Sequence, residues 1–132
     1  MHRPRASQAP PAPSPKSQFT IEARGNHLLV EQSGCLQSKL EATALQDAVL
    51  AACRAHRVRR VIFDNRQSLV PPEEVRDLMW RWVGDPAHLE RVALVLESTM
   101  ASVRANMTAV SHGVRLRSFT TVDDARAWIK EG

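Results

Sequence analysis

The sequence predicts an α/β domain in which an N-terminal β-hairpin precedes alternating helices and strands. Residues 60–68, R-V-I-F-D-N-R-Q-S, contain a short apolar run that suits a strand buried on both faces, as in a parallel sheet. Residues 40–56 show the apolar spacing of a helix, and residues 19–32 read as two paired strands. Strands that alternate with helices imply a mostly parallel mixed sheet with right-handed crossovers and helices packed on it.

The hairpin is predicted from residues 19–24 and 27–32, because apolar and polar side chains alternate in the first segment and Gly25-Asn26 supplies a turn. The helix at 40–56 follows, and the basic run at its end complements the exposed carbonyl groups of a helix C-terminus. The residues that share one face of this helix are Leu45, Val49, Ala52 and His56.

The second helix begins near Pro71-Pro72, since proline and the acidic residues after it suit a first helical turn, and it stops at Gly84. Its buried stripe is predicted to consist of Val75, Leu78, Met79 and Trp82. Trp80 lies off this stripe, so we predict that it contacts a partner unless a neighbouring segment covers it.

The rest of the chain continues the alternation. Residues 90–96, E-R-V-A-L-V-L, are predicted to form a buried strand, and residues 114–119 an edge strand that leads to a helix capped at Thr121. Between them a third helix is predicted over 99–110. Its apolar stripe, which we predict to be core rather than a flexible binding groove, consists of Met100, Val103, Met107 and Val110.

Residues 1–18 contain five prolines and almost no apolar side chain, so we expect a disordered tail there and a folded domain at 19–132. The net charge of the chain is +4, but the tail holds three basic and no acidic residues. The domain is therefore close to neutral, and we expect no nucleic-acid partner.

Several classes of protein are excluded on residue patterns. No window is long and apolar enough to span a membrane, and the N-terminus lacks the apolar centre of a secretory signal. The only cysteines, Cys35 and Cys53, have no metal-ligand spacing, so we expect a reducing cytoplasm, no metal and no cofactor. No glycine-rich phosphate loop is present. A response-regulator receiver is excluded because Glu31 stands without the second acidic residue that Mg²⁺ needs.

Three segments, R-V-I-F-D-N, E-R-V-A-L-V-L and R-L-R-S-F-T-T-V-D-D-A-R-A-W-I, make residues 19–130 resemble the SpoIIAA-like branch of the STAS family. This domain is shared by sulfate transporters and anti-sigma-factor antagonists. In the antagonists, the resemblance implies, a phosphorylated serine or threonine in a D-S-x-G-like loop after the central strand switches partner binding. The matching loop here keeps Asp64, but Asn65 replaces the phosphoacceptor and Ser68 is displaced, so we transfer no phosphorylation site.

The leading hypothesis is a non-enzymatic STAS-like regulatory module in bacterial signalling that binds a protein partner through the loop after the central strand. The residues expected to make this contact are Asp64, Asn65, Arg66, Ser68 and Trp80. The outer strand of the hairpin also offers an edge where two copies could pair, so a homodimer is a further expectation.

Two other hypotheses come from different classes. The alternative function is to carry a small apolar ligand or lipid between the sheet and the helices, near Met79, Trp82, Met100 and Met107. An enzyme that uses Asp64 and Glu97 as an acid–base pair is the least favoured, because such residues more often cap helices and loops.

Overall fold

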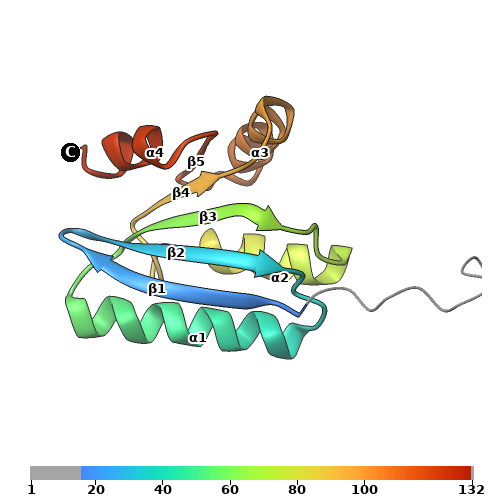
Figure 1. Cartoon of the computed structure of the whole chain (residues 1–132), viewed down its shortest axis with the longest axis horizontal. Coiled ribbons are helices and arrows are strands. Elements are labelled where there is room, and N and C mark those ends of the chain that lie inside the picture. Colours follow the sequence, from blue (N-terminus) through green and yellow to red (C-terminus); the bar gives the residue numbers. More distant parts are fainter. Residues whose placement is uncertain (1–15, 132) are drawn as a thin grey trace, which may run out of the picture.

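The five strands cross the sheet in the same order in which they occur in the chain. In this computed structural model, which describes residues 16–131, β1 (Gln18–Arg24) and β2 (His27–Gly34) form an antiparallel hairpin. The next strands are β3 (Arg60–Ser68), β4 (Arg91–Val95) and β5 (Leu116–Phe119). Each of them pairs in parallel with the strand before it, so that β3 lies beside β2, β4 beside β3 and β5 beside β4 (Figure 1). The predicted α/β architecture is confirmed. Residues 1–15 of the predicted tail lie outside the described residues.

Four helices connect and flank the strands. They are α1 (Lys39–His56), α2 (Glu73–Val83), α3 (Thr99–His112) and α4 (Val122–Ile129). Three of them begin at a hydroxyl residue that accepts a hydrogen bond from a backbone N–H three residues on, namely Ser38, Ser98 and Thr121. The exception is α2, which begins at Pro72 as predicted.

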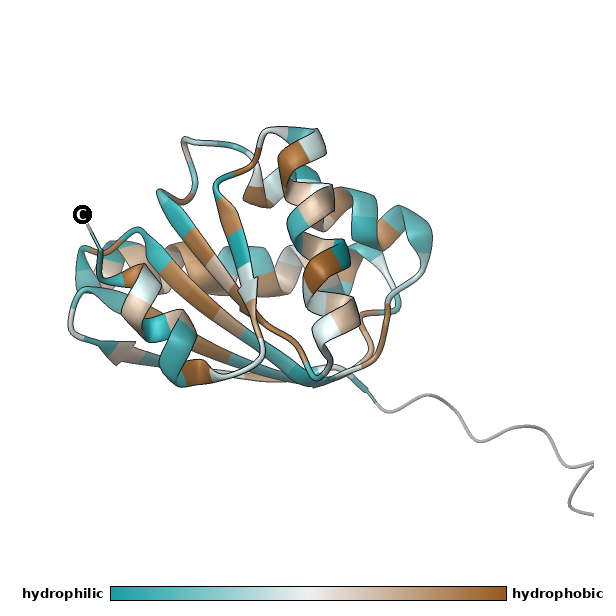
Figure 2. Ribbon diagram, turned by 90° about the horizontal axis from the view of Figure 1, so that it is seen from above, coloured by the Kyte–Doolittle hydropathy of each residue, from teal (hydrophilic) through white to brown (hydrophobic). Residues whose placement is uncertain are grey.

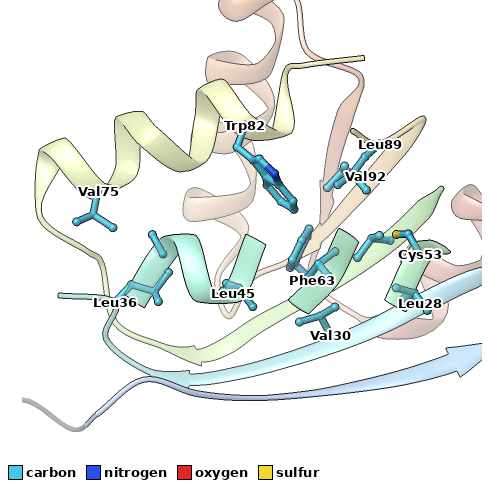
Figure 3. Packing of buried hydrophobic residues seen from close by; sticks show 13 residues of the cluster. Leu28, Val30, Leu36, Leu45, Cys53, Phe63, Val75, Trp82, Leu89 and Val92 are labelled. Atoms are coloured by element: carbon cyan, nitrogen blue, oxygen red, sulfur yellow. The ribbon is translucent and has the colours of Figure 1, made fainter. Parts of the chain in front are cut away.

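The pleat of the strands divides the core into two layers. Phe63 of β3 faces α1 and α2 and meets the edge of the Trp82 ring, with ring centroids 6.3 Å apart (Figure 3). Ile62, its neighbour, faces α4, where it packs with the fully buried Ala125 and Ile129. Figure 2 shows that the central strands carry runs of hydrophobic residues. Because side chains alternate along a strand, such runs make both faces of these strands apolar.

The predicted stripe of α2 is confirmed, since Val75 and Trp82 are buried and Leu78 and Met79 pack against the same cluster. In α1 the prediction holds for Leu45 and Val49 but is wrong for His56, which is exposed.

The predicted core face of α3 is wrong. The four residues of that stripe are exposed, by 63% for Met100, 48% for Val103, 66% for Met107 and 82% for Val110. The buried face carries Ser102, Ala105 and Ala109 instead. The reason lies in how α3 packs on β5, because the Ser102 and Ser118 hydroxyls are 2.6 Å apart and the Ser118 N–H donates to Asn106 Oδ1 at 2.7 Å. Small side chains permit this close approach, and the bulky ones lie on the other side.

The predicted loop after the central strand is the second half of β3. Asp64 is the last residue of β3 that pairs with β4, but Gln67 and Ser68 still pair with Ser33 and Gly34 of β2. The longer β2 supplies backbone partners for this extension, which therefore protrudes past β4. We call this end of the sheet, where β2, β3 and β4 finish, the carboxyl edge.

Candidate functional site

Asp64 lies at the carboxyl edge as a buried carboxylate held by one arginine. Arg66 Nε donates to Asp64 Oδ1 at 2.9 Å and Arg66 Nη2 donates to Oδ2 at 2.8 Å, while the Arg66 backbone N–H donates to Oδ1 at 3.2 Å. The side-chain hydrogen bonds from Arg66 hold the pKa of Asp64 below its usual value, although burial opposes this shift. Asp64 therefore carries charge at neutral pH, whereas a general acid would need a proton there.

Asn65 and Ser68 carry polar atoms that the protein leaves without a partner. Asn65 Oδ1 and Ser68 Oγ are both buried, and neither has a hydrogen bond within residues 16–131. Both residues line one cavity, which Asp64 and Arg66 do not line. Alternation along β3 places residue 65 opposite residues 64 and 66. The register of β3 against β2 then shifts by one residue, since Asp64 pairs with Glu31 but Gln67 with Ser33, and this brings Ser68 to the side of Asn65. The predicted contact residues thus lie on two faces of one strand.

The cavity lies between α2, α3 and the sheet, and its volume is about 410 Å³. We call it the α2–α3 cavity. Its walls are mostly apolar. They include Phe63 of β3, Leu94 of β4, Leu116 of β5, Val83 of α2 and Ala105 of α3. A site of this size and lining has the character of a small-molecule pocket.

Trp80 is half-buried at this cavity. Its ring stacks on the ring of His112, at the end of α3, with centroids 5.9 Å apart and planes at 14°. A neighbouring element thus covers part of the side chain, which was one of the two outcomes considered for Trp80. The uncovered part remains available for contact.

The four residues proposed for a carried ligand are not brought together. Met79 lines the α2–α3 cavity, whereas Trp82 belongs to the core beside Phe63. Met100 and Met107 are exposed and line no part of this cavity, because α3 faces it with other residues.

Four further residues were missed from the sequence. Leu69 and Val70 follow β3 directly and are 51% and 74% exposed. The sequence feature that could have identified them is the position of two large apolar side chains between a strand and a pair of prolines. Arg76 of α2 and Arg104 of α3 line the cavity, and no sequence pattern connects them.

His27 is a buried titratable side chain away from the carboxyl edge. It is 1% exposed at the start of β2, and Asn26 Oδ1 lies 3.0 Å from its Nδ1 atom. Burial lowers the pKa of His27, and the positive charges of Arg126, Lys130 and Arg24 lower it further. The imidazole is therefore neutral in the folded protein at neutral pH.

The described residues contain neither a cluster of metal ligands nor a membrane-spanning helix. Between residues 16 and 131, no three His, Cys, Asp or Glu side chains gather as metal ligands would. Nor does this part of the chain contain a helix with the length and apolar character needed to cross a membrane.

Solved structures match the whole domain. An uncharacterized protein with a SpoIIAA-like fold from Shewanella loihica superposes with a TM-score of 0.66 over 92% of this chain and 98% of that chain, at 10% identity. The chain has a SpoIIAA-like fold. An anti-sigma factor antagonist from Mycobacterium paratuberculosis gives 0.62 over 88% and 96%, at 15% identity. Phosphorylated SpoIIAA, a Bacillus cell fate determinant, gives 0.54 over 86% and 100%, at 14% identity.

The comparison confirms the STAS-like resemblance at the level of the fold. At these identities the likeness shows the fold alone. No protein-family model matches the sequence, and no curated protein matches it either.

Proposed function

We propose that this protein is a non-enzymatic regulatory module of the bacterial cytoplasm that binds a protein partner through the carboxyl edge of its sheet. Two proteins with the same fold are an anti-sigma factor antagonist and SpoIIAA, which supports a regulatory role for the SpoIIAA-like fold. We do not infer from these two proteins which protein this chain binds.

The observation that carries the proposal is the exposed apolar pair Leu69 and Val70 at the end of β3. Large apolar side chains that stay in water beside a charged group are typical of a protein contact surface. Arg66 supplies that charge, since its side chain is 42% exposed while it holds Asp64. Arginine is frequent at such contacts because its planar group pairs with carboxylates.

Site-specific crosslinking in the native host tests this proposal. A photoreactive amino acid at position 70 should give a crosslinked adduct, and the same residue at position 51, an exposed site on α1, should not. Arg66→Glu should weaken the adduct at position 70, because it reverses the exposed charge. An equal yield at both positions, or none at position 70, contradicts a contact at the carboxyl edge.

Trp80→Ala provides a second test. We expect it to weaken partner binding and to lower the free energy of unfolding by less than the loss of a fully buried tryptophan would, because the indole is partly exposed and stacks on His112. A loss near the ~3–5 kcal/mol that removal of a buried tryptophan costs would assign Trp80 to the core instead.

The second candidate function is to carry a small ligand in the α2–α3 cavity. The solved structures give it no support, and its basis is the cavity itself, with a volume of about 410 Å³ and mostly apolar walls. Of the residues first proposed for the ligand, Met79 alone lines this cavity.

A further inference from the structure

Four polar residues that line the α2–α3 cavity come from three elements of the fold. They are Asn65 and Ser68 of β3, Arg76 of α2 and Arg104 of α3; Ser17 and Gln32 line the cavity as well. The described residues that line the cavity include these two arginines and no acidic side chain. Neither guanidinium forms an ion pair within residues 16–131, so the wall carries two uncompensated positive charges.

These polar groups gather at one end of the cavity. Asn65 and Ser68 lie where β3 runs past β4, and Arg76 follows in the first turns of α2. Arg104 lies in the first half of α3, the helix that starts just after β4 ends. All four therefore belong to the carboxyl edge.

The opposite end is apolar. Val92 and Leu116 pair with each other near the starts of β4 and β5, and Val83 is the last residue of α2. Since α2 follows β3 and runs back along the sheet, its last residue lies far from the carboxyl edge. The cavity thus has an apolar interior and a cationic end.

We propose that the α2–α3 cavity binds a small amphiphile that has an apolar body and a single carboxylate. This inference rests on the second candidate function and names the chemical class of its ligand. The apolar body lies against Phe63 and Leu94, while the carboxylate accepts hydrogen bonds from Arg76 and Arg104.

The buried polar atoms of β3 support this class of ligand. Buried polar atoms without a partner are rare in folded proteins, because each costs the hydrogen bonds that it made to water. Ser68 Oγ has a hydroxyl proton to donate, and a carboxylate accepts it. An ionised carboxylate has no proton for the Asn65 oxygen, so Asn65 contributes through the N–H donors of its amide. A wholly apolar ligand would leave the Ser68 hydroxyl unpaired.

The test compares two probes that share a chain and differ in the head group. Decanoate and decanol are titrated into the full chain, with calorimetry for stoichiometry and tryptophan fluorescence for the site, because Trp80 lines the cavity. Decanoate should bind one per chain and at least about tenfold more tightly than decanol, since hydrogen bonds to a charged group are strong.

Variants locate the site. Arg76→Gln and Arg104→Gln should each weaken decanoate about tenfold and leave decanol unchanged. The matched control is Arg54→Gln, an exposed arginine of α1 that should not affect either probe. Ala101→Phe, which places a ring at the cavity wall, should weaken both probes while circular dichroism stays the same.

Each alternative result is decisive. Decanoate and decanol could bind equally well, with Ala101→Phe as the only variant that weakens them. That result would support the carrier function and refute the proposal that the ligand has a carboxylate. Binding that Ala101→Phe leaves unchanged would place the ligand elsewhere and refute this site. No binding of either probe would refute both the ligand class and the carrier function.

Discussion

The exposed face of α3 gives a quantitative test of the structure, because the sequence pattern predicts that this face is buried in the core. Met107→Ala removes most of a side chain that would be buried if the apolar stripe were core. In that case the free energy of unfolding would fall by about 2–5 kcal/mol, as for other buried methionines and leucines. The two arrangements therefore differ by several kcal/mol at a single residue.

The structure predicts a much smaller loss. Met107 is 66% exposed, so about one third of its surface is out of water. Complete burial of a methionine stabilises a fold by about 1.5–3 kcal/mol, and one third of that is ~0.5–1 kcal/mol. Alanine also has the higher helix propensity, which offsets a few tenths. We expect Met107→Ala to cost less than ~1 kcal/mol.

Urea unfolding followed by tryptophan fluorescence measures this difference. The matched control is Leu45→Ala, which shortens a helical side chain with 0% exposure and should cost about 2–5 kcal/mol. Both variants are measured at two protein concentrations. A loss above about 2 kcal/mol at Met107 would refute the exposed face. If that loss changed with concentration, a second copy of the chain would be covering it.

Three further outcomes follow from single contacts. Trp82→Ala should cost about 3–5 kcal/mol in urea unfolding, because the ring is 7% exposed against Phe63, and a loss below ~1 kcal/mol would contradict its core position. Since the pKa of His27 is lowered, the unfolded chain binds a proton below about pH 6.5 while the folded imidazole stays neutral. Stability should therefore fall as the pH drops below about 7, and it should fall less in His27→Gln. Since Arg66 lowers the pKa of Asp64, that pair stabilises the fold at neutral pH and the contribution is lost as the pH falls below about 4, a decrease that Asp64→Asn should reduce.

The strands could be predicted from the sequence because their burial depends on short, local patterns. The run Val61-Ile62-Phe63 is apolar on both faces, and the structure buries it between two helical layers. The start of α4 was equally local, since the predicted cap, Thr121, accepts a hydrogen bond from the backbone N–H of Asp124 in its own helix. Features of this kind need no knowledge of what lies across the fold.

The orientation of α3 could not be predicted in this way. A helical apolar stripe indicates the buried face only if the neighbouring element has room for large side chains. Here β5 approaches closely enough for Ser102 to reach Ser118, and Ala105 and Ala109 fill the remaining contact. That distance depends on how α3 folds back onto β5, the next element in the chain, and no pattern within α3 records it. Likewise, Arg76 and Arg104 come from different helices and line the same cavity.

The two proposed functions share part of the carboxyl edge, because Leu69, Val70 and Trp80 of the partner surface also line the α2–α3 cavity. Asp64 and Arg66 are the residues that separate them experimentally. Asp64 and Arg66 face away from the cavity, whereas Asn65 lines it. A change at Arg66 therefore alters the partner surface without touching the ligand, and a change at Arg104 does the reverse. If a variant of Arg104 also abolished the crosslink at position 70, ligand and partner would be linked at the cavity wall, which both residues line. Independent responses would show that the ligand and the partner use this shared edge without affecting each other.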